Sequence, residues 1–302
     1  MSDRALPLHH PLVASLLARC TFPVGGTPVT CAVSRGADSS ALLVLAVASG
    51  CVATAVHIDH ALRPGSADEA HTVASLARSL GTEFRSVTVH VGDGPNLEAR
   101  ARAARYAALP ADALTGHTAD DQAETVLVNL LRGAGLTGLA GMRADHRRPL
   151  LALRRADTEA LCAAMGVQVV HDPTNLDPRH LRNRVRHELL PLMADLAQRD
   201  PAPVLARQAQ VVRADADLLD ELASTLDPTD ARALAAAPVP LARRAVRAWL
   251  TEEHPPDLAT VERVLQVARG EALGTDVGDG RRVTRHQQRL RLDPSTHTSK
   301  SD

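Results

Sequence analysis

The residues with the clearest chemical potential lie between Val29 and Leu45, where an apolar strand leads through a short polar loop into a helix. The loop reads Ser34-Arg35-Gly36-Ala37-Asp38-Ser39. Small residues let backbone N–H groups approach a ligand, Ser34 and Ser39 add hydroxyl donors, and the helix dipole points its positive end at the same place. This pattern predicts a phosphate site, although an ordinary strand-to-helix turn with a serine cap would use similar residues.

Asp38 narrows the choice of ligand for this loop. Its carboxylate would repel a bare phosphate unless a cation lay between them. A nucleotide bound together with Mg²⁺ is therefore the better match to the loop.

A second group of acids opens the helix predicted over Ala119–Arg132. The dipole of a helix favours one or two acids at its N-terminus, but here there are three, Asp120, Asp121 and Glu124. Asp121 and Glu124 are three residues apart, and Asp120 and Glu124 are four apart, so either pair shares a helix face. Each pair could hold a cation or a cationic substrate.

Arginine and histidine are concentrated between Leu176 and His187, around a predicted helix start. A run of charges is usually a solvated helix face. Contact with phosphate or RNA is the alternative, and the sequence alone leaves both open.

Strand and helix patterns alternate through the first half of the chain and must position these groups. The predicted strands are Val29–Val33, Cys51–Ile58, Phe84–Val91 and Ala111–Thr115, and the helices between them are Ser40–Ala48, Ser66–Leu80 and Asn96–Ala108. This alternation predicts an α/β fold with a doubly wound, Rossmann-like parallel sheet, which binds ligands at the carboxyl ends of its strands. The loop after Val33, His57 to Asp59, and His117 all lie at such ends.

The second half of the chain lacks the alternation of strand and helix patterns. A Pro-rich segment, 199–203, looks like a linker between a catalytic domain over residues 1–200 and a smaller, mainly helical domain over 201–294. Helical patterns cover Val204–Leu226, Leu241–Leu250 and Ala259–Ala268, and Val283–Leu292 alternates like a small hairpin strand. Residues 295–302 are expected to be a disordered tail.

Composition excludes several kinds of chemistry. Lys300 is the only lysine among 302 residues, which rules out a Walker-type phosphate loop and a Schiff-base lysine in the body of the protein. The four cysteines form no C-x-x-C pair, and four aromatic residues are too few for a base-stacking platform. A net charge of −1 indicates that any basic surface is local. No apolar run is long enough to span a membrane and no signal peptide is evident, so a cytoplasmic protein is expected.

Taken together, these segments resemble the tRNA(Ile)-lysidine synthase family, a branch of the N-type ATP-pyrophosphatase (PP-loop) proteins, whose loop is usually S-G-G-x-D-S. The likeness covers most of the chain. It includes 34–39, 57–66, 97–102, 116–141 with its Asp-Asp-Gln-x-Glu-Thr core, 172–175 and 182–188. A single S-x-G-x-D-S would be a weak signal, but this many blocks in order are specific.

The resemblance implies ATP-dependent attachment of free L-lysine to C2 of the wobble cytidine in the CAU anticodon of tRNA(Ile), through an adenylated cytidine. By the same resemblance, Asp38 positions Mg²⁺, and Asp121 and Glu124 recognise lysine. The residues expected to bind ATP are Ser34, Arg35, Gly36, Ala37, Asp38, Ser39, His57, Asp59 and His117. Arg132 is expected in catalysis, and Arg100, Arg182 and Arg186 are candidates for substrate or phosphate contacts. No membrane partner is expected, and the possibility of a homodimer is left open.

Arg35 departs from the family pattern, because it stands where the loop has its first glycine. If that position needs a positive φ, a side chain there costs about 1 kcal/mol or more in strain. Alternatively, the guanidinium folds outward or adds a phosphate contact. Retained activity is the expectation, because Gly36, Asp38 and both serines remain.

Two other functions fit parts of the sequence. A PP-loop tRNA thiolase would also adenylate a base, but it needs cysteines for sulfur transfer or for a cluster. A non-catalytic tRNA-binding relative would account for Arg35. Adenylation of the matching tRNA distinguishes an enzyme from a binder.

Overall fold

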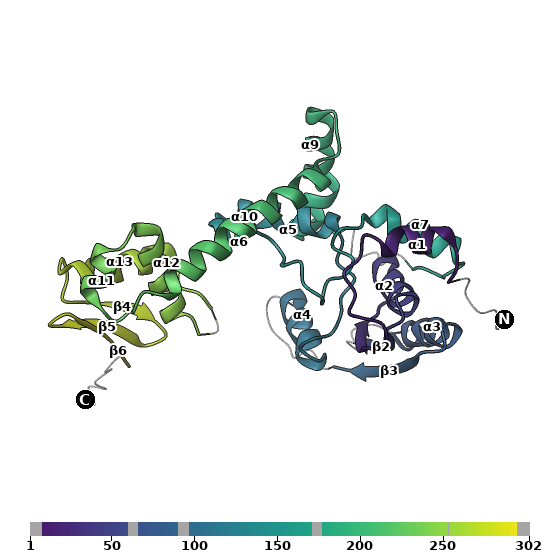
Figure 1. Ribbon diagram of the computed structural model, residues 1–302, viewed down its shortest axis with the longest axis horizontal. Helices are drawn as coiled ribbons and strands as arrows, with labels where there is room; N and C mark the ends of the chain where they lie inside the picture. The colour runs from purple at the N-terminus through teal and green to yellow at the C-terminus, as the bar shows by residue number, and fades with distance from the viewer. Residues whose placement is uncertain (1–7, 60–65, 90–96, 171–176, 253, 295–302) are drawn as a thin grey trace. The chain divides into compact units, whose positions relative to one another are not determined.

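The computed structural model of the protein describes residues 8–59, 66–89, 97–170, 177–252 and 254–294. The chain divides into two compact units, Met1–Val211 and Val212–Asp302, and each is described by itself. The division falls within the long helix α10 (Pro201–Ser224) and not at 199–203 (Figure 1). The prolines of the predicted linker lie in the first turn of α10, where their missing N–H groups are not needed.

The first unit combines a parallel sheet with helices. Its elements are α1 (Pro11–Leu17), β1 (Pro28–Ala32), α2 (Ala37–Ala48), β2 (Val52–Asp59), α3 (Ser66–Ser79), β3 (Glu83–Thr88), α4 (Leu97–Ala108), α5 (Ala119–Leu131), α6 (Leu136–Leu139), α7 (Arg155–Ala164), α8 (Leu181–Arg184), the π-helical turn η2 (Val185–Leu189), α9 (Leu190–Ala197) and the start of α10. Parts of the resemblance, at 60–65 and 171–176, and the predicted tail 295–302 lie outside the described residues.

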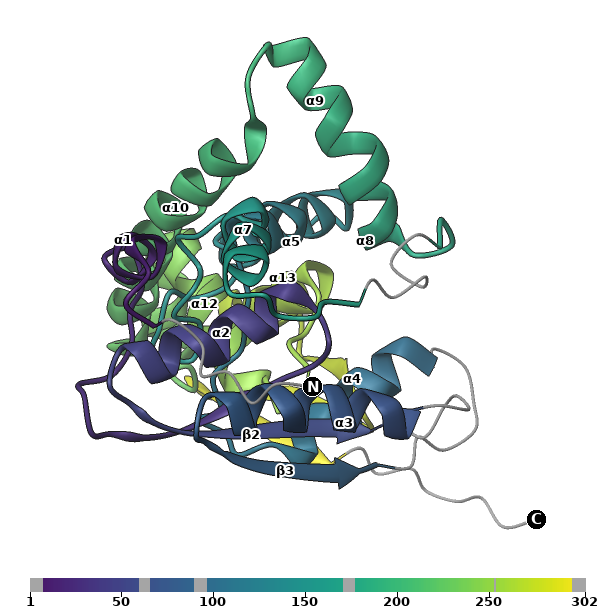
Figure 2. The same ribbon diagram turned by 90° about the vertical axis from the view of Figure 1, so that its right-hand side faces the viewer.

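The sheet has the strand order β1-β2-β3, and both of its strand pairs are parallel. Figure 2 shows β2 and β3 side by side and running in the same direction. The strand predicted at Ala111–Thr115 shrinks to a single bridge, in which Leu114 pairs with Cys31 of β1. The remainder of that segment forms a turn, so this predicted strand is a bridge at the edge of the sheet and not a full member of it.

Both faces of the sheet are covered, as the doubly wound prediction requires. Ala53 and Ala55 of β2 face the main core, which α1, α2, α3 and α7 complete. Val56 and Ile58 alternate with them and pack on the other face against Leu109 and the segment after α4. A parallel strand buried on both faces needs apolar residues on both, and these four residues of β2 supply them.

One close approach of two backbones joins the edge of the sheet to α2. A Cβ atom built on Gly116 would lie 2.5 Å from the carbonyl oxygen of Asp38 and 3.0 Å from the backbone nitrogen of Ser39. Carbon and oxygen atoms cannot approach so closely, so the residue after Thr115 must be glycine. The contact places the backbone of the segment before α5 directly against the first turn of α2.

The second unit has a helical layer and a small sheet. Its elements after α10 are α11 (Ala231–Ala236), α12 (Val239–Leu250), α13 (Leu258–Arg269), β4 (Gly274–Gly278), β5 (Arg281–His286) and β6 (Arg289–Pro294). The strand predicted at Val283–Leu292 is in fact two antiparallel strands, β5 and β6, with Gln287 at φ 55° in the turn between them. The pattern had not indicated β4, whose two glycines are unfavourable in strands.

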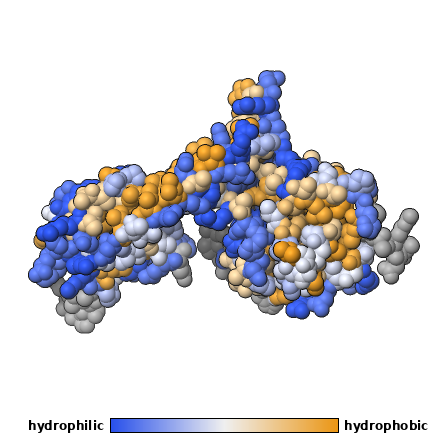
Figure 3. Space-filling view, viewed as in Figure 1, coloured by the Kyte–Doolittle hydropathy of each residue, from blue (hydrophilic) through white to orange (hydrophobic). Residues whose placement is uncertain are grey.

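Figure 3 shows apolar side chains at the surface along α10, and Leu218 and Leu222 are among those exposed. Charged residues are interspersed with them along the same helix. None of the described helices is both long and apolar enough to cross a membrane.

Candidate active site

The predicted phosphate loop connects β1 to α2 and is held in shape by its own serines. The hydroxyl oxygens of Ser34 and Ser39 lie 2.9 Å apart, and the Ser34 N–H donates to Ser39 Oγ at 3.0 Å. The helix starts at Ala37, three residues earlier than predicted, with Gly36 as its extended N-cap. Asp38 is therefore part of the first helical turn. No described side chain caps α2, so its first N–H groups suit an anionic ligand.

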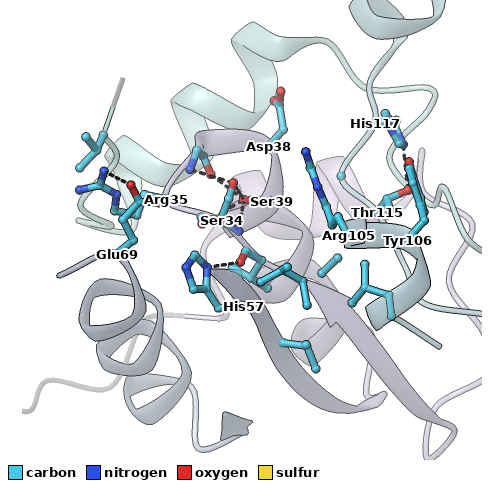
Figure 4. Close-up of a pocket in the computed structure, with 18 residues that line it drawn as sticks. Ser34, Arg35, Asp38, Ser39, His57, Glu69, Arg105, Tyr106, Thr115 and His117 are labelled. Carbon is cyan, nitrogen blue, oxygen red and sulfur yellow. Dashed lines mark hydrogen bonds and ion pairs between the residues drawn. The ribbon is translucent and has the colours of Figure 1, made fainter. Parts of the chain in front are cut away.

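A cavity of about 430 Å³ opens over this loop (Figure 4). Arg35 and Glu69 lie on one side of it, Ser34, Ser39 and His57 in the middle, and residues from α4 and the 115–117 segment on the other side. Its volume is within the range typical of small-molecule sites.

Most of the residues predicted to bind a nucleotide line this cavity. They are Ser34, Arg35, Gly36, Asp38, Ser39, His57 and His117. Ala37 and Asp59 are close in sequence but do not contribute to its wall. His57 is only 3% exposed, and its Nδ1 lies 3.0 Å from the carbonyl oxygen of Val33, so it supports the strand end.

Helix α4 contributes different residues from the one predicted. Arg105 and Tyr106 line the cavity, whereas Arg100, one and a half turns earlier, does not. Arg132 is exposed at the C-cap of α5, two turns beyond Glu124. The structure therefore separates Arg100 and Arg132 from the cavity wall.

Arg35 fits the loop without backbone strain. Positive φ values among the described non-glycine residues occur at Gln198, Asp279 and Gln287, and Arg35 is not among them. Its guanidinium donates to Glu69 Oε1 at 2.6 Å, and both side chains line the cavity. The arginine thus neutralises an acid that would otherwise face the ligand.

We expect Arg35→Gly to raise the KM for ATP by about threefold to tenfold, because Glu69 would then stand uncompensated beside the triphosphate. Arg35→Gly combined with Glu69→Gln should restore the parent value. The measurement is the rate of ATP turnover at varied ATP concentration, in the two variants and in Glu69→Gln alone, which gives the KM for ATP. A hundredfold rise in turnover of Arg35→Gly would instead mean that the arginine obstructs the loop.

Asp38 projects from the first turn of α2 and is held from helix α7. Thr158 Oγ1 donates to Asp38 Oδ1 at 2.5 Å, and Arg155 Nε lies 3.5 Å from Asp38 Oδ2. Burial raises the pKa of Asp38 to about 6, and the negative charge of Asp121 adds to this effect, while Thr158 and Arg155 oppose it. The folded protein therefore binds this proton more tightly than the unfolded chain does.

This raised pKa predicts a pH-dependent difference in stability. Between about pH 4 and pH 6 the folded state holds the Asp38 proton and the unfolded state does not, so the stability contributed by this residue falls as pH rises. We expect metal-free, nucleotide-free Asp38→Asn to exceed the parent by about 1 to 3 kcal/mol in free energy of unfolding at pH 7. Urea titrations from pH 4 to 7.5 test this, and a difference that does not change with pH would contradict it.

The acidic pair Asp121 and Glu124 lies on one face of α5, as predicted, and is surrounded by arginines. Glu124 is fully buried and Asp121 is 9% exposed. Arg186 Nε donates to Glu124 Oε1 at 2.6 Å, and Arg182 Nε donates to Glu124 Oε2 at 2.7 Å. A buried carboxylate requires such partners, because its isolated charge would be very costly. The arginine-rich segment predicted at 176–187 thus lies partly against α5 and is not simply a solvated face.

The pKa of Asp121 reflects both burial and these charges. Burial alone would raise it, but Arg155 and Arg182 together with the N–H of Thr118 hold it below its usual range. The acid is thus ionised at neutral pH.

The third acid, Asp120, has a structural role. Its carboxylate accepts two hydrogen bonds from the Arg154 guanidinium, at 2.8 and 3.0 Å, and one from the Arg155 N–H at 2.8 Å. These bonds fasten the start of α7 to the start of α5. Of the two pairings that the sequence left open, the structure therefore keeps Asp121 with Glu124.

Arg154, Arg155 and Thr158 were not predicted. A signal was present, because two arginines at the start of a helix oppose its dipole and therefore imply acids nearby. The sequence could not say which acids, since Asp38 and Asp120 are more than thirty residues away from them.

The donor set in the cavity fits a hard cation bound together with phosphates. Mg²⁺ is commonly held by one or two carboxylates while substrate phosphate oxygens supply further ligands. Asp38 is the acid that the loop contributes to the cavity wall, which the hydroxyl-bearing Ser34 and Ser39 also line. Within the described residues no cluster of three or more His, Cys, Asp or Glu side chains could hold a metal without a ligand's help.

Similarity to known proteins agrees with this architecture. The PP-loop domain model matches residues 12–193, more than half of the chain. The tRNA(Ile)-lysidine synthase of Nocardia farcinica is 42% identical over 280 residues, which cover 86% of this chain and 88% of that protein. The enzyme of the same name from Rhodococcus erythropolis is 43% identical, and the match covers 74% of each chain.

A solved structure gives independent support for the fold. The U34-tRNA thiolase NcsA from Methanococcus maripaludis, determined with its 4Fe-4S cluster, superposes with a TM-score of 0.53 and 13% identity. The match covers 68% of this chain and 79% of that one. Together, the loop, the covered parallel sheet and these matches show that the chain belongs to the tRNA(Ile)-lysidine synthase family of PP-loop proteins.

Proposed function

We propose that the protein is an ATP-dependent ligase that attaches L-lysine to C2 of the wobble cytidine in the CAU anticodon of tRNA(Ile). In the first step, the C2 oxygen of cytidine attacks the α-phosphorus of ATP and pyrophosphate leaves. In the second step, the side-chain amine of lysine attacks C2, the bond from C2 to the AMP oxygen breaks, and a proton is lost. The products are lysidine, AMP and pyrophosphate.

One observation supports this reaction more than any other. Asp38 of the phosphate loop and the buried acids Asp121 and Glu124 are all within reach of the single guanidinium of Arg155. A nucleotide held by the loop and an amine held by the acids would be near neighbours, and proximity is the main requirement of a two-substrate transfer.

In the first step, the chain contributes binding and orientation. The N–H groups at the start of α2 and the hydroxyls of Ser34 and Ser39 suit the phosphates, and Asp38 is the residue that would hold Mg²⁺. When bound, Mg²⁺ would neutralise charge on the departing pyrophosphate. Arg35 cancels the charge of Glu69 beside the same phosphates.

In the second step, the acidic pair would receive the amine of lysine. Three guanidiniums, from Arg155, Arg182 and Arg186, now neutralise three carboxylates, those of Asp38, Asp121 and Glu124. A cationic amine must therefore replace at least one guanidinium. Arg182 and Arg186 come from the short elements α8 and η2, and anionic tRNA phosphates are natural partners for them once they leave.

The second unit is proposed to bind tRNA. Arg247, Arg269 and Arg291 are exposed on α12, at the end of α13 and on β6. Such arginines suit a phosphate backbone. Because ATP and tRNA are cytoplasmic compounds, the proposed reaction would run there.

The thiolase alternative is disfavoured by the state of the thiols. All four cysteines are free, and burial raises the pKa of Cys20, Cys31 and Cys162 to about 12 in each case. Sulfur transfer requires an accessible thiolate, which such thiols do not provide.

The decisive experiment is mass analysis of the wobble nucleoside after tRNA(Ile) is incubated with the protein, ATP and lysine. The expected result is lysidine, formed only when both ATP and lysine are present. Thiolated nucleoside would support the thiolase alternative, and unmodified cytidine with intact tRNA binding would indicate a non-catalytic relative.

A further inference from the structure

Arg155 stands between the two halves of the candidate active site. Its Nε lies 3.5 Å from Asp38 Oδ2, and its Nη2 lies 3.2 Å from Asp121 Oδ1 and 3.4 Å from Glu124 Oε1. The side chain is largely buried. In the described part of the chain, it is the arginine whose ion pairs reach both the phosphate loop and the acidic pair.

The backbone of Arg155 is fixed to the helix that carries the acids. It is the first residue of α7, and its N–H donates to Asp120 Oδ2 at 2.8 Å. Asp120 precedes Asp121 in the first turn of α5. One turn further along α7, the buried Thr158 donates to Asp38. The start of α7 therefore touches the loop side and the acid side together.

Arg182 and Arg186 differ from Arg155 in this respect. They bind Asp121 and Glu124 from α8 and η2, and their ion pairs do not extend to Asp38. Either could leave the acids without changing what holds the loop. Removing the Arg155 guanidinium would instead remove the ion pairs that link the Asp38 carboxylate directly to the acidic pair. Two arginines would still neutralise the acids, and Thr158 would still hold Asp38.

We propose that Arg155 is a positioning residue for lysine transfer: it fixes the acidic pair relative to the phosphate loop, so that the bound amine is aligned with the activated cytidine. This role rests on the proposed function. It differs from a charge-binding role in a measurable way. Loss of one positive charge makes the site more attractive to a cationic amine, so lysine should bind at least as well while its transfer slows.

The test separates the two half-reactions in Arg155→Met and Arg155→Lys. Pyrophosphate exchange stimulated by tRNA(Ile) measures adenylation, and lysine-dependent AMP release from pre-adenylated tRNA in a single turnover measures transfer. For Arg155→Met we expect transfer to slow at least thirtyfold more than adenylation does, because Arg155 also contacts Asp38, and we expect no rise in the KM for lysine. Arg155→Lys should recover about tenfold of the loss in transfer and should still transfer lysine more slowly than the parent, because its ammonium keeps the charge but not the forked geometry.

Arg19→Met is the matched control. Arg19 forms an ion pair at 2.9 Å with Asp157, which lies on α7 as Arg155 does. Neither Arg19 nor Asp157 lines the cavity. The Arg19→Met substitution should leave the rates of both half-reactions within twofold of the parent. Thermal unfolding of all variants reports any loss of folding.

The outcomes decide between the roles. Equal slowing of both steps in Arg155→Met, or a large rise in the KM for lysine, overturns the positioning role, as does normal transfer. If Arg155→Met proves too unstable to assay, failure of Arg155→Lys to slow transfer selectively overturns it. A parent protein that makes no lysidine refutes the proposed function itself, which is a separate result.

Discussion

Asp38→Asn is expected to bind tRNA(Ile) as the parent does and to form almost no adenylated cytidine. The substitution keeps the size of the side chain and leaves an oxygen that can accept from Thr158. It removes the one charged oxygen ligand that the first turn of α2 offers to a magnesium–nucleotide complex. We expect adenylation to fall at least a thousandfold, which corresponds to about 4 kcal/mol of barrier.

Pyrophosphate exchange measures this loss, and a gel-shift titration measures tRNA binding. Asp112→Asn, at an exposed position between α4 and α5, is the control and should match the parent in both assays. The combination of an inactive variant with higher stability at neutral pH would show that the acid is retained for function, at a cost in stability. Survival of adenylation would remove Asp38 from the magnesium role.

Glu124→Gln is expected to raise the KM for lysine at least thirtyfold while the KM for ATP stays within threefold. The side chain keeps its shape but loses its charge in a fully buried position among three guanidiniums. The excess positive charge that remains would repel an incoming ammonium group, and low solvent exposure strengthens this repulsion. Steady-state kinetics with each substrate varied in turn gives both constants.

Two further variants test whether the effect is specific to the buried acidic pair. Asp121→Asn should shift the same constant in the same direction, because that acid shares its arginines with Glu124. Glu188→Gln removes an acid from an exposed i, i+4 ion pair with Arg184 and should change neither constant. Equal rises in both KM values for Glu124→Gln would move the acid to the nucleotide site.

The sequence was a good guide wherever local pattern determines structure. The apolar strands, the loop after Val33 and the acid face of α5 follow from spacing and residue type, and the resemblance added the function. The edge of the parallel sheet was less predictable. The segment at 111–115 has a strand-like composition but makes only one bridge to β1, because strand formation depends on the neighbouring chain as well as on the segment.

Interactions between distant segments could not be derived from the sequence. The spacing of Asp121 and Glu124 indicates a shared face, but it cannot show that Arg155, Arg182 and Arg186 all converge on that face. The same holds for Arg35, whose negative φ and contact with Glu69 depend on where α3 lies. Charges that neutralise one another from different elements become visible only in the folded chain.

Gly116 carries no group that could bind or react, yet it lets two stretches of main chain meet where the two halves of the candidate active site adjoin. What it provides is unoccupied volume. A search for functional positions that ranks side chains by their reactivity would overlook it. In less similar members of such families, a position where no side chain fits can therefore identify the junction between two substrate sites as surely as a charged residue does.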